Sequence, residues 1–376
     1  MKKISMVDLH GQYLRHKIEI DAAIQGVLDS SAFIKGPDVD LFQQELAAYM
    51  DVTHCIACAN GTDALQIAMM ALGLQPGDEV ITTPFTFIAT IEVISLLKLK
   101  PVLVDVDADT FNLDPSLLEH AITSKTRAIV PIHLFGQTAD MNRIIPIARK
   151  HKLKIIEDNA QAIGANYRLS DGKSGKAGSL GDIGCTSFFP SKNLGAYGDG
   201  GAVFTNNDEL GTLLRSITNH GMSRRYYYDH VGVNSRLDTM QAAILRIKLR
   251  HLDEYNKARQ VVAAAYDEAF GKIEALSIPV RNPDSEHIFH QYTLQVENGQ
   301  RDALQSWLNE HDVPAMVYYP VPLHLQNAYS SLGYKEGDFP VSERLCERVI
   351  SLPIHTEMED DQLQHIISTV KQFFSR

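Results

Sequence analysis

The sequence is poor in the features that mark several specialised classes of protein. Four cysteines in 376 residues are too few for a scaffold held together by disulfides. No apolar run reaches the length of a membrane span, and the opening M-K-K-I-S-M-V-D-L-H lacks the apolar stretch of a signal peptide. We therefore expect a cytoplasmic protein that does not act in a membrane.

Positive charge is also scarce. The 35 lysines and arginines face 46 aspartates and glutamates, which gives a formal net charge of -11. This balance argues against a protein that coats nucleic acid or an anionic membrane, so an anionic ligand must be held by a local cluster of groups. The fifteen histidines are scattered without an H-E-x-x-H or comparable spacing, and we expect no metal.

Two of the cysteines, Cys55 and Cys58, form a C-x-x-C motif that is compatible with a redox or metal site. The motif has no second C-x-x-C, and the surrounding H-C-I-A-C-A alternates in the manner of a strand. Small buried thiols are therefore the favoured interpretation.

Between residues 54 and 217, short apolar runs alternate with segments of helical period. This alternation is typical of an α/β protein with a mostly parallel sheet that helices cover on both faces. Ligands of such sheets bind at the carboxyl ends of the strands, so residues that follow a strand are the first candidates for chemistry. We expect strands at 54–59, 79–83, 101–107, 127–134, 153–158, 185–189 and 202–206.

The character of the chain changes near residue 250. A helix at 252–270 is followed by a strand near 289–296, a helix at 301–310 and a closing helix from 359. Because a chain of this length exceeds what one hydrophobic core usually serves, we expect a large domain over 1–250 and a smaller α+β domain over 251–376.

A carboxylate and an amine stand out at the ends of two expected strands. Asp158 closes the apolar strand L-K-I-I-E-D, and Lys192 follows the next strand in S-F-F-P-S-K with no acidic residue close in sequence. Asp158 is either a helix cap or loop ion partner, or a fixed negative charge that holds a proton on a ligand's ring nitrogen. A pyridinium paired with a carboxylate, and a lysine that forms a Schiff base, are what pyridoxal phosphate chemistry requires.

A cofactor phosphate would need an anion site at the same edge of the sheet. A-N-G-T-D-A-L follows the first strand and opens a helix, so the N–H groups of Gly61 and Thr62 and the Thr62 hydroxyl can bind an anion. Taken alone, the motif is an ordinary helix cap. Ser187 adds a hydroxyl near Lys192. Phe87, in T-P-F-T-F-I-A-T, either stacks on a planar ring or packs in the core.

These motifs together resemble the DegT/DnrJ/EryC1/StrS family of nucleotide-sugar aminotransferases. The resemblance covers nearly the whole chain and rests on C-A-N-G-T-D-A-L, G-D-E-V-I-T-T-P-F-T-F-I-A-T, I-I-E-D-N-A-Q-A-I-G-A, C-T-S-F-F-P-S-K-N-L-G-A-Y-G-D-G-G-A and V-N-S-R-L-D-T-M-Q-A-A-I-L. It implies the aspartate aminotransferase fold, which is fold type I of the transferases that depend on pyridoxal 5'-phosphate (PLP), with a mostly parallel central sheet in the large domain.

The resemblance also implies a role for each matching residue. Lys192 is similar to the lysine that binds the PLP aldehyde, Asp158 to the partner of the pyridine nitrogen and Phe87 to the ring-stacking residue. Gln161 resembles the residue beside the ring's phenolic oxygen. The implied phosphate ligands are Gly61, Thr62, Ser187 and Asn234. In the family this asparagine reaches the site of the other subunit, which implies a homodimer.

Within the family, the resemblance points to enzymes that act on the 3-oxo form of UDP-N-acetylglucosaminuronic acid (UDP-2-acetamido-2-deoxy-ribo-hexuluronate). L-Glutamate would donate the amine, PLP would cycle through pyridoxamine phosphate, and the amino sugar would serve O-antigen lipopolysaccharide or another surface polysaccharide. Arg236, in V-N-S-R, is then a candidate fork for the hexuronate carboxylate. Tyr318 and Tyr319 are further candidates, with Tyr318 where a histidine is expected. Arg224 and Arg225 bind the nucleotide diphosphate or are solvated surface.

Other interpretations stay open at the level of sequence. An aminotransferase for another UDP- or dTDP-linked ketosugar would carry the same motifs. A dehydratase of this fold would have a histidine in place of Lys192, and a nicotinamide oxidoreductase would need G-x-G-x-x-G opening a helix, where a strand follows here. A non-catalytic PLP-binding regulator would need a DNA-binding segment, which neither the charge nor the motifs indicate.

Overall fold

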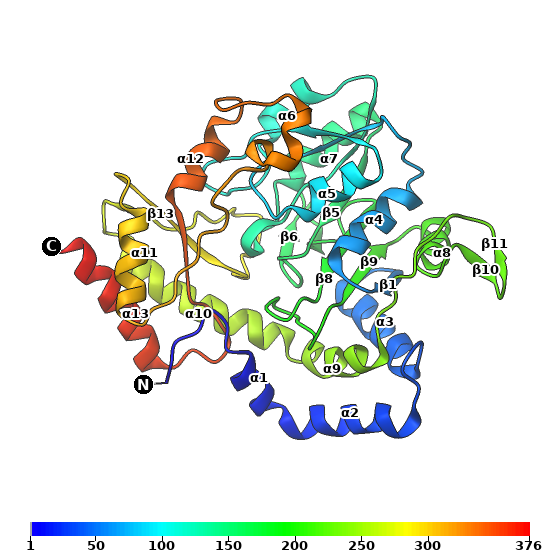
Figure 1. Cartoon of the computed structure of the whole chain (residues 1–376), viewed down its shortest axis with the longest axis horizontal. Helices are drawn as coiled ribbons and strands as arrows, with labels where there is room; N and C mark the ends of the chain where they lie inside the picture. Colours follow the sequence, from blue (N-terminus) through cyan, green and yellow to red (C-terminus); the bar gives the residue numbers. More distant parts are fainter. Residues whose placement is uncertain (1) are drawn as a thin grey trace.

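The computed structural model describes residues 2–376 and contains a large central sheet with strand order β1-β9-β8-β5-β4-β2-β3 (Figure 1). Its strands are β1 (His54–Cys58), β2 (Glu79–Thr82), β3 (Lys100–Leu103), β4 (Thr126–Ile129), β5 (Lys154–Asp158), β8 (Ile183–Ser187) and β9 (Gly201–Thr205). Every neighbouring pair is parallel except that β9 runs antiparallel to both β1 and β8. The expected α/β fold with a mostly parallel sheet is confirmed, because each expected strand of this sheet is present. The strands expected at 101–107 and 127–134 were predicted too long, since they end at Leu103 and Ile129.

Helices cover both faces of this sheet. They are α3 (Pro37–Met50), α4 (Gly61–Ala71), α5 (Ala89–Leu96), α6 (Pro115–Ala121), α7 (Met141–His151), α8 (Asp208–Ile217) and α9 (Thr239–Leu249). Alternate residues of β1 enter two cores, as the two-residue period of a strand requires: Ile56 and Cys58 pack with α4, α5 and α8, whereas Cys55 and Ala57 pack with α3 and α9. Both cysteines are unpaired, and burial raises the pKa of each thiol, so the expectation of small buried thiols is confirmed.

A smaller antiparallel sheet follows, with strand order β12-β13-β14. The elements of this region are α10 (Leu252–Phe270), β12 (Leu276–Ser277), β13 (Tyr292–Val296), α11 (Arg301–Glu310), η2 (Leu323–Leu325), η3 (Asn327–Leu332), α12 (Pro340–Arg348), β14 (Val349–Leu352) and α13 (Asp360–Phe374). Ile4 packs into the core of this sheet, and the Met6 carbonyl accepts a hydrogen bond from Ile354 N at 3.3 Å. The start of the chain thus packs with its carboxyl-terminal region, and the domain division at residue 250 stays a prediction.

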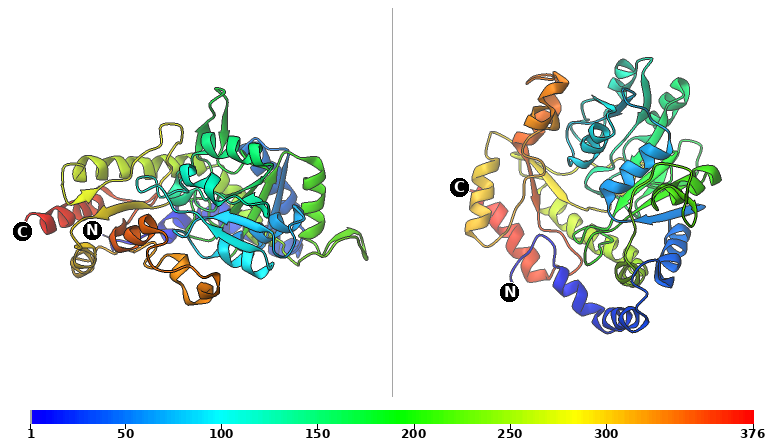
Figure 2. Two further views of the ribbon diagram at one scale, coloured as in Figure 1. Left: turned by 90° about the horizontal axis from the view of Figure 1, so that it is seen from above. Right: turned by 45° about the vertical axis from the view of Figure 1, so that its right-hand side comes forward.

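The remaining elements are two hairpins, two amino-terminal helices and one short turn of helix. They are α1 (Leu9–Arg15), α2 (Lys17–Ser30), η1 (Leu134–Gly136), β6 (Asn166–Arg168), β7 (Ser174–Lys176), β10 (Met222–Arg224) and β11 (Tyr227–Tyr228). Helix α2 lies alongside α9, and the β10–β11 hairpin projects beyond the body of the molecule (Figures 1 and 2). Across residues 2–376, no helix combines the length and the apolar character that crossing a bilayer requires.

Candidate active site

Asp158 is the last residue of β5 and is only 8% exposed. Its Oδ2 accepts a hydrogen bond from Thr90 Oγ1 at 2.7 Å, and its Oδ1 accepts one from Ala160 N at 3.2 Å. Both bonds fix the position of the carboxylate. Asp158 therefore places an anchored carboxyl group at the carboxyl edge of the sheet, and it caps no helix.

Lys192 lies in the loop that joins β8 to β9. Its Nζ has no hydrogen-bond or ion-pair partner among residues 2–376. Burial lowers the pKa of this amine to about 8, and the charge of Asp158 opposes that shift. An amine with this pKa is partly neutral near physiological pH, which is the state a nucleophile or proton acceptor needs.

The loop that carries Lys192 is held at several points. Lys192 N donates to Phe189 O at 2.8 Å, and the buried Asn193 Nδ2 donates to Asn256 Oδ1 at 2.8 Å. The buried Lys248 amine donates to the Gly195 carbonyl. These contacts fix the backbone on both sides of Lys192, so the position of its Cα atom is well defined.

The residues of the expected anion site lie where β1 and β8 end and β9 begins. Cys58 of β1 pairs with Gly201 of β9, which in turn pairs with Ser187 of β8. Gly61 follows at the start of α4, so close to Ser187 that a Cβ on Gly61 would lie 2.6 Å from the Ser187 Cβ. The Asn60 side chain caps α4 by accepting from Asp63 N at 2.8 Å, which leaves the N–H groups of Gly61 and Thr62 without an intrahelical acceptor.

Aromatic side chains line the same edge. Phe87 is 56% exposed, and its ring centroid lies 6.5 Å from that of Tyr319. Gln161 is buried, accepts from Phe135 N at 2.7 Å and donates from Nε2 to Tyr319 Oη at 3.2 Å. Phe87 therefore belongs to no core and is free to stack on a planar ring, beside a fixed amide and a buried phenol.

The structure adds two residues that the sequence did not single out. Thr90 is buried on α5 and donates to Asp158, although nothing in T-F-I-A-T marked that hydroxyl. His290 is buried, its Nδ1 has no hydrogen-bond partner among the described residues, and burial followed by the charges of Lys192 and Arg259 lowers its pKa. The sequence signal that could have pointed to His290 is its position in F-H-Q-Y-T-L-Q-V, at the start of an otherwise largely apolar strand.

The other expected residues lie at the margin of this cluster. Ser235 accepts from Ala59 N at 3.0 Å, so the V-N-S-R segment runs beside the end of β1. Asn234 is exposed, and Arg236 is partly buried without an ion pair to any of residues 2–376. Arg224 and Arg225 lie on the exposed β10–β11 hairpin, outside the cluster around Lys192.

Tyr318 is the neighbour of Tyr319, and their ring centroids lie 5.9 Å apart. The ring of Tyr319 also lies 6.2 Å from that of the buried Phe85. Burial raises the pKa of both tyrosine hydroxyls, so both are neutral donors at physiological pH. The two tyrosines therefore form one wall of the site, with Tyr319 turned toward Gln161.

These residues meet the requirements of PLP. An amine without a protein partner, a buried carboxylate, an exposed aromatic ring and free N–H groups at a helix start suit its aldehyde, ring nitrogen, ring face and phosphate. The fold and the cofactor together define a fold type I, PLP-dependent aminotransferase. The chain belongs to the DegT/DnrJ/EryC1/StrS aminotransferase family, whose model matches residues 15–371.

Relatives and solved structures agree with this class. A Pseudomonas aeruginosa protein described as UDP-2-acetamido-2-deoxy-3-oxo-D-glucuronate aminotransferase is 46% identical, over 98% of this chain and 99% of its own. A Geobacillus stearothermophilus protein described as a pleiotropic regulatory protein is 47% identical, over 99% of this chain and 98% of its own. The crystal structure of S. venezuelae DesV in complex with a ketimine intermediate matches with a TM-score of 0.96 and 40% identity, over 100% of both chains.

Proposed function

We propose that this chain transfers the amino group of L-glutamate to UDP-2-acetamido-2-deoxy-3-oxo-glucuronate and releases the 3-amino sugar and 2-oxoglutarate. The observation that carries the reaction is the presence of two groups at one sheet edge: the Lys192 amine, which burial holds partly neutral, and the Asp158 carboxylate, which a hydrogen bond from Thr90 holds in position. The similarity to the P. aeruginosa aminotransferase supports this sugar.

Each residue has a separate task in this reaction. When bound, PLP supplies an electron-withdrawing ring that stabilises negative charge at the donor's α-carbon. Asp158 keeps a proton on the ring nitrogen, which maintains that withdrawal. Lys192 takes the proton from the α-carbon and returns it to the cofactor's exocyclic carbon, and it performs the reverse transfers for the sugar. Gly61, Thr62 and Ser187 hold the phosphate, while Phe87 and Gln161 fix the plane of the ring.

Arg236 is the proposed ligand of the sugar carboxylate. It is partly buried, lies one residue after Ser235 at the end of β1, and forms no ion pair within residues 2–376. A guanidinium without a carboxylate of its own suits a bidentate pair with a hexuronate. Tyr318 and Tyr319 are the proposed contacts on the opposite side of the sugar.

A reverse-direction assay tests the substrate. The enzyme is given 2-oxoglutarate and a panel of UDP- and dTDP-linked 3- and 4-amino sugars, each with and without a sugar carboxylate. We expect turnover with the UDP-linked 3-amino hexuronate, and a loss of preference for the carboxylate in Arg236→Met. Turnover of neutral dTDP sugars alone would overturn both the substrate and the role of Arg236, and would favour the dTDP-sugar alternative.

A homodimer with shared sites completes the proposal. The β10–β11 hairpin projects from the body of the chain (Figure 2). Tyr226, Tyr227 and Tyr228 on it are exposed, and Val231 beyond it is 84% exposed. Apolar side chains on a projecting arm are typical of a surface that another chain covers. Such an arm would bring Asn234 to the partner's cofactor phosphate and Arg224 and Arg225 to the nucleotide. The product would serve a surface polysaccharide such as O-antigen, and four free cysteines suit the cytoplasm.

A regulator is the alternative from a different class, because one relative carries that description. The two functions are distinguished with Lys192→Ala. If the chain is an aminotransferase, the unmodified protein loses its yellow colour with glutamate, and Lys192→Ala loses both turnover and the covalently attached cofactor. If it is a regulator that only senses PLP, glutamate leaves the colour of the unmodified protein unchanged.

A further inference from the structure

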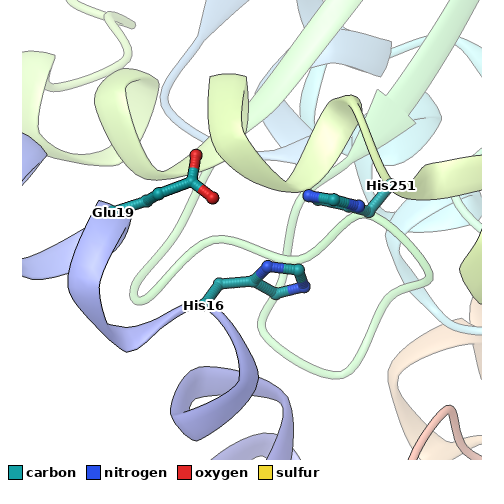
Figure 3. Close-up of side chains that lie close together, drawn as sticks. All are labelled: His16, Glu19 and His251. Atoms are coloured by element: carbon teal, nitrogen blue, oxygen red, sulfur yellow. The ribbon is translucent and has the colours of Figure 1, made fainter.

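Two bends between helices bring together three side chains that are not part of the cluster around Lys192 and Asp158. His16 is the single residue that separates α1 from α2, and His251 is the residue before α10, just after α9 ends. Glu19 lies in the first turn of α2. Figure 3 shows the side chains of these three residues converging from the two bends.

The three side chains are spaced like a set of metal ligands. One ligand atom from each of His16, Glu19 and His251 lies within 4.8 Å of the other two. The centroids of the two imidazole rings are 4.2 Å apart with a 30° angle between their planes. Ligand atoms around a tetrahedral zinc ion lie about 3.4 Å apart, so small rotations of the exposed Glu19 and the partly buried His251 bring the set to bonding distance.

A fourth residue orients one of the rings. His251 Nδ1 lies 3.2 Å from Glu254 Oε2, in the first turn of α10. A carboxylate beside one ring nitrogen, with the metal on the other, is the arrangement seen around histidine ligands of metals. The carboxylate–histidine pair is therefore oriented for coordination through Nε2.

His16 has an unused ring nitrogen. The residue is buried and its Nε2 has no hydrogen-bond partner among residues 2–376. A buried imidazole nitrogen without a protein partner can serve as a metal ligand. The competing cation is Arg250, whose guanidinium lies 3.6 Å from Glu19 Oε2 and would have to give way.

We propose that His16, Glu19 and His251 bind a divalent transition-metal ion of the zinc type, with Glu254 orienting His251 and water completing the coordination. Two nitrogens and one carboxylate oxygen are a common zinc ligand set. The ion would join the α1–α2 bend to the α9–α10 bend and so clip the amino-terminal helices to the large domain. This site departs from our sequence expectation of no metal, because the histidines are far apart in the chain.

The test uses the PLP-loaded, tag-free enzyme after dialysis against a chelator. Zn²⁺ is titrated by calorimetry and Co²⁺ by visible absorption, since tetrahedral Co²⁺ gives a strong band. We expect one ion per chain, a higher Tm with Zn²⁺, and loss of binding in His251→Gln and His16→Gln. Glu254→Gln should weaken binding about 10- to 100-fold.

Two further variants separate metal binding from misfolding and from binding elsewhere. Glu19→Gln changes an exposed side chain, so it should fold normally and still bind Zn²⁺ more weakly. His151→Gln is the matched control, because His151 pairs with Glu119 at 3.5 Å but belongs to no group of three potential ligands among the described residues, and the binding of Zn²⁺ should be unchanged. The proposal is wrong if no ion binds, or if Glu19→Gln and His251→Gln bind as the unmodified protein does.

Discussion

At the scale of single residues, the chemistry depends on the pKa of the Lys192 amine, on which burial and a neighbouring charge act in opposite directions. Burial lowers the pKa of the amine to about 8, and Asp158 acts in the opposite direction. Neither group is hydrogen-bonded to the other, so their coupling acts through space. The site thus keeps an amine whose charge changes near the physiological range within the electrostatic influence of a carboxylate.

The pH dependence of cofactor attachment follows from this pKa. Only the neutral amine attacks the PLP aldehyde, and the neutral fraction rises with pH until the pKa is passed. The rate of covalent attachment to cofactor-free protein should therefore rise about tenfold per unit of pH below about 8 and be level above it. Stopped-flow absorbance across pH 6–10 measures it. In Asp158→Asn the midpoint should move to lower pH, and a rate that climbs to pH 10 in the unmodified protein would contradict the burial of Lys192.

Asp158 itself should matter far more for turnover than the residue that holds it. Asp158→Asn keeps the shape of the side chain but removes the charge that maintains the proton on the ring nitrogen. We expect kcat to fall about 10²- to 10³-fold, the range for removing one preorganised electrostatic contact. Thr90→Val removes only the 2.7 Å hydrogen bond and should cost much less. Steady-state kinetics of both variants measure the two losses in kcat. Similar losses in both would mean that turnover depends on the position of the Asp158 side chain and not on its charge.

At the scale of elements, the start of α4 and the end of β8 are packed too closely for a side chain on Gly61. A Cβ there would lie 2.6 Å from the Ser187 Cβ. Gly61→Ala should therefore lower the free energy of unfolding by about 1–3 kcal/mol and weaken PLP binding. Gly26, inside α2, has no atom within 4 Å of its added Cβ, so Gly26→Ala should instead stabilise the protein by about 0.5–1 kcal/mol. Chemical denaturation of both variants, and PLP titration of the first, provide the comparison.

The elements that the sequence predicted are those whose pattern is local. The apolar strands with helices between them follow from periods of two and 3.6 residues, and Asp158 and Lys192 stand out because each ends an apolar run. β14 was not predicted, because V-I-S-L gains its strand geometry by pairing with β13, which lies far away in the chain. Long-range pairing of this kind leaves little local trace.

At the scale of the whole molecule, what the sequence could not reveal is mostly contact between distant segments. Thr90 and Asp158 meet only because β5 and α5 reach the same edge, and His16 and His251 meet only because α2 lies against α9. The family resemblance supplied the residue roles directly. It did not supply the amino-terminal cluster, since a resemblance transfers only residues that a motif contains.

The sharing of sites between two subunits can be tested by mixing two inactive variants. Lys192→Ala removes the proton carrier, and Asn234→Asp places a negative charge against the cofactor phosphate, which should weaken PLP binding at least about tenfold. If Asn234 serves the partner's site, a mixed dimer has one doubly altered site and one intact site. Equal mixing after reversible dissociation should then restore about a quarter of the full activity at limiting PLP. If Asn234 serves its own site, no mixed dimer contains an intact site and the mixture stays as inactive as its components, which would overturn the shared-site dimer while leaving the aminotransferase function untouched.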